Sequence, residues 1–74
     1  MEAASLHAVR DVGQAQARVE RAVAALPVPQ REVFLLVVGE GLEPGEAAEV
    51  LGITAEAARQ RLARARRTVE EVLA

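Results

Sequence analysis

Arginine side chains that could bind DNA are concentrated in the last third of this sequence. Five arginines lie between Arg59 and Arg67 with no acidic residue among them, and Gln60 follows the first of them. Guanidinium groups donate hydrogen bonds to phosphates and, in a bidentate geometry, to guanine, while a glutamine amide pairs with adenine. These residue types indicate contact with duplex DNA, with Arg59 and Gln60 best placed for base edges and the later arginines for phosphates.

The distribution of charge along the chain supports this interpretation. The net charge of the 74 residues is −2, but residues 54–74 hold five arginines and three glutamates, whereas residues 1–53 hold four arginines and eight acids. A solvated helix face is the ordinary explanation for exposed arginines. An acid-free basic run in an otherwise acidic chain favours a polyanionic partner instead.

The sequence offers few candidate residues for metal binding, catalysis or single-strand binding. The sequence has no cysteine and one histidine, His7, so we expect no metal, no cofactor and no thiol nucleophile. The glutamates form no acid–base pair, so we expect no enzymatic activity. Phe34 is the only aromatic residue, which disfavours base stacking on single strands. No apolar run is long enough to cross a membrane, and we expect a cytoplasmic protein without a membrane partner.

The composition predicts an all-α fold, because helix-forming residues dominate and valine is the main strand former. Apolar spacing, prolines and glycines predict four helices, over residues 15–26, 29–38, 44–51 and 55–73. Residues 1–14 are interpreted as a linker remnant or a frayed helical arm, and residues 15–74 as one small domain.

The last two predicted helices form a helix-turn-helix at about residues 43–67, in a three-helical core like that of winged-helix proteins but without the wing. Gly52 makes the turn, Thr54 caps the second helix, and Ala48 is small enough for close approach. We expect the apolar side of the second helix to comprise Ala58, Leu62, Ala65, Val69 and Val72. We expect its opposite side to comprise Glu56, Gln60, Ala63, Arg64 and Arg67, with Arg59, Arg61 and Arg66 on the flanks.

Six consecutive apolar residues, 33–38, stand in the second predicted helix. Consecutive residues on a helix point around its whole circumference. Such a run is most often core, but part of it can face a protein partner in so small a domain.

Three motifs resemble domain 4 (region 4) of bacterial RNA polymerase sigma factors, especially the extracytoplasmic-function group. They are LPVPQREVFLL, EGLEPGEAAEVLGIT and RQRLARAR, and the resemblance covers about residues 25–73. It implies a compact four-helix domain whose last helix binds the −35 element of double-stranded promoter DNA. It also implies contact with the flap of the polymerase β subunit and, as a further candidate partner, an anti-sigma factor.

By position, the DNA-reading residues of the resembled family correspond to Glu56, Ala57, Arg59, Gln60, Ala63 and Arg64. We assign contact with DNA to these residues and also to Thr54, at the helix start, and Arg67, farther along the helix. Contact with protein partners is assigned to Val33, Phe34, Leu36 and Val37. Where the family usually has a hydroxyl residue and an aromatic one, this sequence has Glu43 and Pro44.

Two alternatives stay open at this point. The output domain of a response or quorum regulator has a similar helix-turn-helix, although the RLARAR ending favours the sigma hypothesis. A protein-interaction module without DNA binding, such as an adaptor or an anti-sigma-binding domain, would fit the acidic balance of the chain.

Overall fold

A computed structural model describes the backbone of residues 2–73 and the side chains of residues 13–73. The described chain consists of helices joined by short turns and loops and has no strand, which confirms the predicted all-α fold. In chain order the elements are α1 (Glu2–Ala24), α2 (Val28–Phe34), the π-helical turn η1 (Leu35–Gly39), α3 (Pro44–Leu51) and α4 (Ala55–Leu73).

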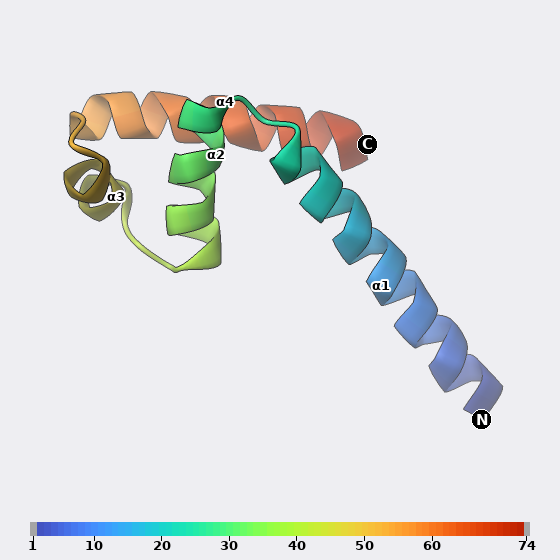
Figure 1. The fold of residues 1–74 in the computed structure, drawn as a ribbon. Helices are drawn as coiled ribbons and strands as arrows, with labels where there is room; N and C mark the ends of the chain where they lie inside the picture. The colour runs from blue at the N-terminus through green and yellow to red at the C-terminus, as the bar shows by residue number, and fades with distance from the viewer. Residues whose placement is uncertain (1, 74) are drawn as a thin grey trace.

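Helix α4 is the element against which the others pack. Figure 1 shows α3 at the N-terminal end of α4, α2 crossing it near the middle, and the end of α1 meeting its C-terminal half. The rest of α1 runs away from the body, so that the fold measures 51 × 21 × 15 Å. The core between the helices consists of Ala22, Val23, Leu26, Val33, Phe34, Ala48, Ala58, Leu62, Ala65 and Val69.

Helix α1 is longer than the prediction of residues 15–26, because it begins at Glu2. Gly13 lies inside it, and a glycine costs only about 1 kcal/mol relative to alanine in a helix interior. Helix propagation on both sides offsets that cost. The end of α1 is tied to α2, because the Arg31 guanidinium donates a hydrogen bond of 3.1 Å to the carbonyl of Ala24.

The second predicted helix, 29–38, is divided in the structure. Regular helix ends at Phe34, and the wider turn η1 follows, in which the Glu40 N–H donates to the Leu35 carbonyl at 3.0 Å. Gly41, with a φ of 78°, then redirects the chain toward α3. Glycine adopts this left-handed backbone conformation at little cost.

Candidate nucleic-acid interface

The turn between α3 and α4 has the geometry that a helix-turn-helix requires. Gly52 ends α3 in the left-handed region, with φ 68° and ψ 34°. The N–H of Ile53 donates to the carbonyl of Ala48 at 3.0 Å, which satisfies an end carbonyl of the helix. Ala48 and Ala58 are 3% and 0% exposed. These two small side chains allow α3 and α4 to approach closely.

Thr54 sets the start of α4. Its Oγ1 accepts a hydrogen bond of 3.0 Å from the N–H of Ala57, which is the predicted N-cap. The residue is exposed, so the hydroxyl proton stays available to an external acceptor. Thr54 therefore combines a structural role with an exposed position at the N-terminal end of α4.

The start of α3 is capped by a carboxylate instead of the hydroxyl that is usual in the resembled family. The N–H of Glu43 donates to the Glu46 side chain at 2.9 Å, and Pro44 occupies the first turn. Glu43 and Glu46 are both exposed. Negative charge therefore lies beside the helix-turn-helix.

The inner side of α4 consists of one row of buried residues, here called the buried row: Ala58, Leu62, Ala65 and Val69. Val72 was expected to continue it, but that prediction is wrong, because Val72 is 52% exposed. It stands one turn beyond Val69, the last buried residue of α4. The packing of α4 against the other helices therefore ends at Val69, before the end of α4 itself.

Six exposed residues make up what we call the outer face of α4. At about 100° per residue, Gln60 and Arg67 lie about 170° from the middle of the buried row, and Ala63 and Arg64 about 130° from it. Arg59 borders this surface at about 90°. The members of the outer face are Glu56, Arg59, Gln60, Ala63, Arg64 and Arg67. Ala57, also assigned to DNA, is only partly exposed.

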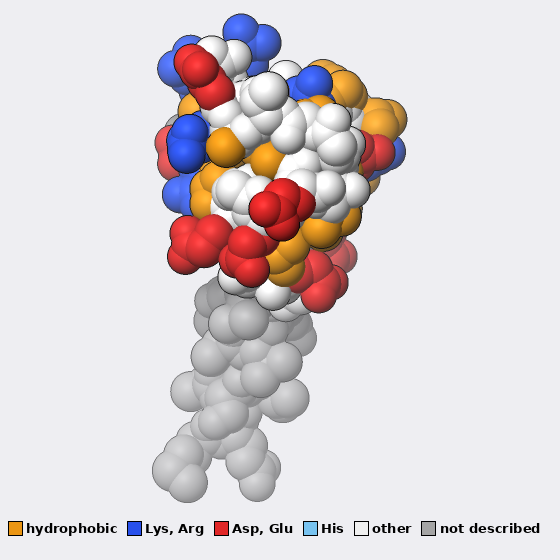
Figure 2. Space-filling model, turned by 90° about the vertical axis from the view of Figure 1, so that its left-hand side faces the viewer, with side chains coloured by type: hydrophobic (Ala, Val, Ile, Leu, Met, Phe, Trp, Pro, Cys, Tyr) orange, Lys and Arg blue, Asp and Glu red, His pale blue; other side chains and the backbone are white. Residues whose placement is uncertain are grey.

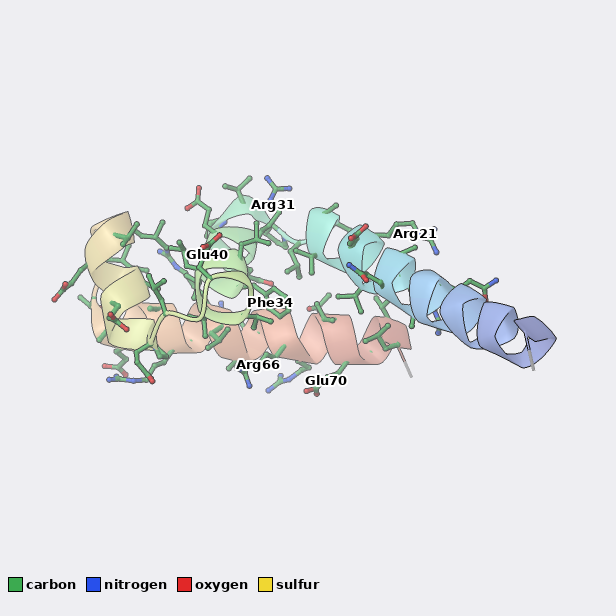
Figure 3. All side chains as sticks on the ribbon, turned by 90° about the horizontal axis from the view of Figure 1, so that it is seen from below. Arg21, Arg31, Phe34, Glu40, Arg66 and Glu70 are labelled. Carbon is green, nitrogen blue, oxygen red and sulfur yellow. The ribbon has the colours of Figure 1, made fainter. Side chains whose placement is uncertain are left out.

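The five arginines of α4 do not share a single surface. Arg61 is half-buried on one flank of the helix. Arg66 lies on the other flank, where it lines a hollow together with Phe34 and Val38. In Figure 3, Arg66 and Glu70 lie on the same edge of α4, with Phe34 between α2 and α4. The outer face thus keeps Arg59, Arg64 and Arg67.

The family model described as Sigma-70, region 4 matches residues 16–69. The chain belongs to the sigma-70 region 4 family. Region 4 is the domain with which sigma factors recognise the −35 element of promoters, and the family binds promoter DNA and RNA polymerase and is not an enzyme family. No curated protein and no solved structure matches the chain.

The matched residues include the whole helix-turn-helix of this region 4 domain. The match begins within α1 and ends at Val69, the last residue of the buried row. Figure 2, a view from the α3 end, shows arginine side chains along the upper rim over α4. Several acidic side chains lie lower, over α3 and the loop before it. On this view the acidic side chains therefore lie mainly over α3 and the loop before it, below the arginines of the upper rim.

The residues assigned to protein partners divide between core and surface. Val33 is 0% and Phe34 8% exposed, so both side chains belong to the core, and contact of these two residues with a partner stays a prediction. Leu36 and Val37 are half-buried. A run of consecutive apolar residues has no periodicity, and the packing of α2 on α4 decides which of them face inward.

Two hollows lie on either side of Phe34. The first, of about 350 Å³, lies between α1 and α2 and is lined by Val19, Glu20, Val23, Ala24, Arg31, Phe34 and Leu35. The second, of about 290 Å³, lies between α2 with η1 and α4 and is lined by Phe34, Val38, Arg66, Val69 and Glu70. Leu35 and Val38, at their edges, are 49% and 51% exposed. We call this combined surface the apolar hollows.

Within the part of the chain that the structure describes, the acidic side chains form no group of three that could hold a metal ion. None of the described helices has the length and apolar character needed to span a bilayer.

Proposed function

We propose that this domain recognises the −35 element for a sigma factor of the extracytoplasmic-function type by placing α4 in the major groove. The observation that carries the proposal is the outer face of α4. It is exposed, it contains three arginines and a glutamine, and its position opposite the buried row leaves it free of the domain's own helices. A helix with this distribution of side chains fits the major groove of B-DNA.

The outer face offers different groups to different parts of the duplex. Near the start of α4, Arg59 and Gln60 are within the reach of base edges, where they would pair with guanine and adenine. Glu56, in the first turn, would accept a hydrogen bond from the amino group of cytosine. Farther along α4, Arg64 and Arg67 would contact phosphates, which contribute affinity and register without sequence information.

Replacing Arg67 with alanine is expected to weaken binding evenly across DNA sequences. Loss of one phosphate contact should reduce the slope of log affinity against log salt concentration by about 0.9. Fluorescence anisotropy with labelled duplexes over a range of salt concentrations measures this slope.

Arg66→Ala is the matched control, because it removes the same charge from a side chain that lines a hollow. Its slope should change less than that of Arg67→Ala. Equal slopes for the two variants, or a change in base preference after Arg67→Ala, would contradict the phosphate assignment. Absence of any salt-dependent binding by the unaltered domain would support the alternative of a pure protein-interaction module.

We further propose that the apolar hollows receive the flap of the polymerase β subunit. A partner that places apolar side chains beside Phe34 would cover Leu35 and Val38, which are the large exposed apolar residues at this position. Arg31 and Glu20 on one hollow and Arg66 and Glu70 on the other supply polar margins. Apolar centres with polar margins are typical of protein interfaces.

Leu35→Ser is expected to weaken binding of a purified β-flap fragment about five- to tenfold, because roughly half of a leucine side chain loses its apolar contact. DNA binding should stay unchanged. Val50→Ser is the control, since Val50 is 65% exposed on α3 and away from the hollows. The flap proposal fails if calorimetric titration gives the same affinity for Leu35→Ser as for the unaltered domain.

An anti-sigma factor that binds this domain would use the same apolar hollows in our proposal. Capture by such a factor would then compete with the polymerase flap for Leu35 and Val38. The competition is tested by adding flap fragment to a preformed complex of the domain with its anti-sigma factor. Displacement supports a shared surface, and a stable ternary complex rules it out.

A further inference from the structure

The middle of the outer face of α4 carries a methyl group instead of a hydrogen-bonding side chain. Ala63 is exposed, and by helix geometry it lies about 130° from the middle of the buried row. Measured in the same direction, the outer face extends from Arg59, at about 90°, through Gln60, at about 190°, to Arg64, at about 230°. Ala63 is therefore flanked on both sides by groups that can donate hydrogen bonds, and offers none itself.

The packing of the domain does not require alanine at this position. Ala58 and Ala65, both 0% exposed, must be small because they lie between α4 and its neighbours. Ala63 is exposed and lies about 130° from the buried row, so a longer side chain would fit the isolated domain. The small size of Ala63 therefore has no role in the isolated domain, but it would affect the contact with a binding partner on the outer face.

In the major groove, one base presents an apolar group. Thymine carries a C5 methyl, and alanine is among the side chains that contact it favourably. A side chain without polar atoms cannot satisfy the donors and acceptors of the other base edges, and its small size allows the backbone of α4 to come close to the floor of the groove.

We propose that Ala63 recognises a thymine methyl group at the centre of the DNA site of this domain. The inference rests on the proposed docking of α4 in the major groove and adds to it one base and one contact. Arg59 and Gln60, about one turn earlier on the helix, would contact base pairs next to this thymine. The contact predicts a preference for thymine over cytosine and also over uracil, which lacks the methyl group.

The test uses a duplex selected by the domain from a randomised library of double-stranded DNA. Each thymine of the selected duplex is replaced in turn by deoxyuridine, and the affinity is measured with the unaltered domain and with Ala63→Gly. At one thymine the unaltered domain should bind the deoxyuridine duplex about fourfold more weakly, the value expected for one buried methyl group. With Ala63→Gly the ratio of the two affinities should fall close to one.

The ratio does not depend on folding, because each protein is compared with itself on two duplexes and any loss of helix stability from glycine cancels. If deoxyuridine has no effect at any position, or if its effect is as large for Ala63→Gly as for the unaltered domain, the methyl contact is overturned while the proposed docking stands. If the domain selects no duplex at all, the proposed docking and the methyl contact both fail.

Discussion

Replacing Arg59 with alanine is expected to lower the affinity of the domain for its preferred duplex by about ten- to a hundredfold. Arg59 is exposed on the border of the outer face, near the start of α4, where a guanidinium reaches the edge of a guanine. A bidentate pair with guanine contributes more than a single phosphate contact because it also leaves an unpaired acceptor when it is lost. The loss of base discrimination should be confined to one base pair.

This outcome is measured by titrating the domain against the preferred duplex and against each single base-pair substitution. For the Arg59→Ala variant, base-pair substitution at one position of the duplex should no longer change the affinity. Base-pair substitutions at the other positions should still lower the affinity. Arg61→Ala is the matched control, because Arg61 is half-buried on the opposite flank of α4. An even loss of affinity on every duplex after Arg59→Ala would move Arg59 from the base-reading set to the phosphate-binding set.

Replacing Phe34 with alanine is expected to destabilise the fold by about 3–5 kcal/mol. Phe34 is 8% exposed and lies in the core between α2 and α4, with a hollow on each side. A domain of this size buries a limited core, so a loss of this magnitude removes much of its stability. The unfolding midpoint should fall by more than about 10 °C in a circular-dichroism melt.

Val38→Ala is the control for this experiment, because Val38 follows Phe34 by one turn and is 51% exposed. Its effect on stability should stay within about 0.5 kcal/mol. A Phe34→Ala variant that melts like the unaltered domain and fails only in binding a protein partner would overturn the assignment of Phe34 to the core.

The sequence-based prediction is most accurate where single residues mark the ends of helices. The bounds of α3 and α4 agree with the predictions 44–51 and 55–73. Pro44 and Thr54 mark the starts of these helices, and Gly52 supplies the left-handed residue between them. The regular spacing of the buried row fixes the orientation of α4 and hence of its outer face.

The sequence predicted least well where local signals are absent or conflict. The six apolar residues 33–38 give no preferred side, so burial of Val33 and exposure of Leu35 follow only from contacts between helices distant in sequence. Gly13 suggested a break in a segment that is helical from Glu2. The flank position of Arg66 follows from helix spacing, but the hollow that Arg66 lines is formed with Phe34 and Val38, which come from other elements.

The docking of α4 is tested most directly by a nuclear magnetic resonance titration of the labelled domain with its selected duplex. The account predicts that the largest amide shifts occur at Thr54 and along the outer face of α4, with small shifts in η1 and around the apolar hollows. Large shifts confined to η1 and the hollows, with the outer face of α4 unchanged, would contradict the proposal that this helix enters the DNA groove.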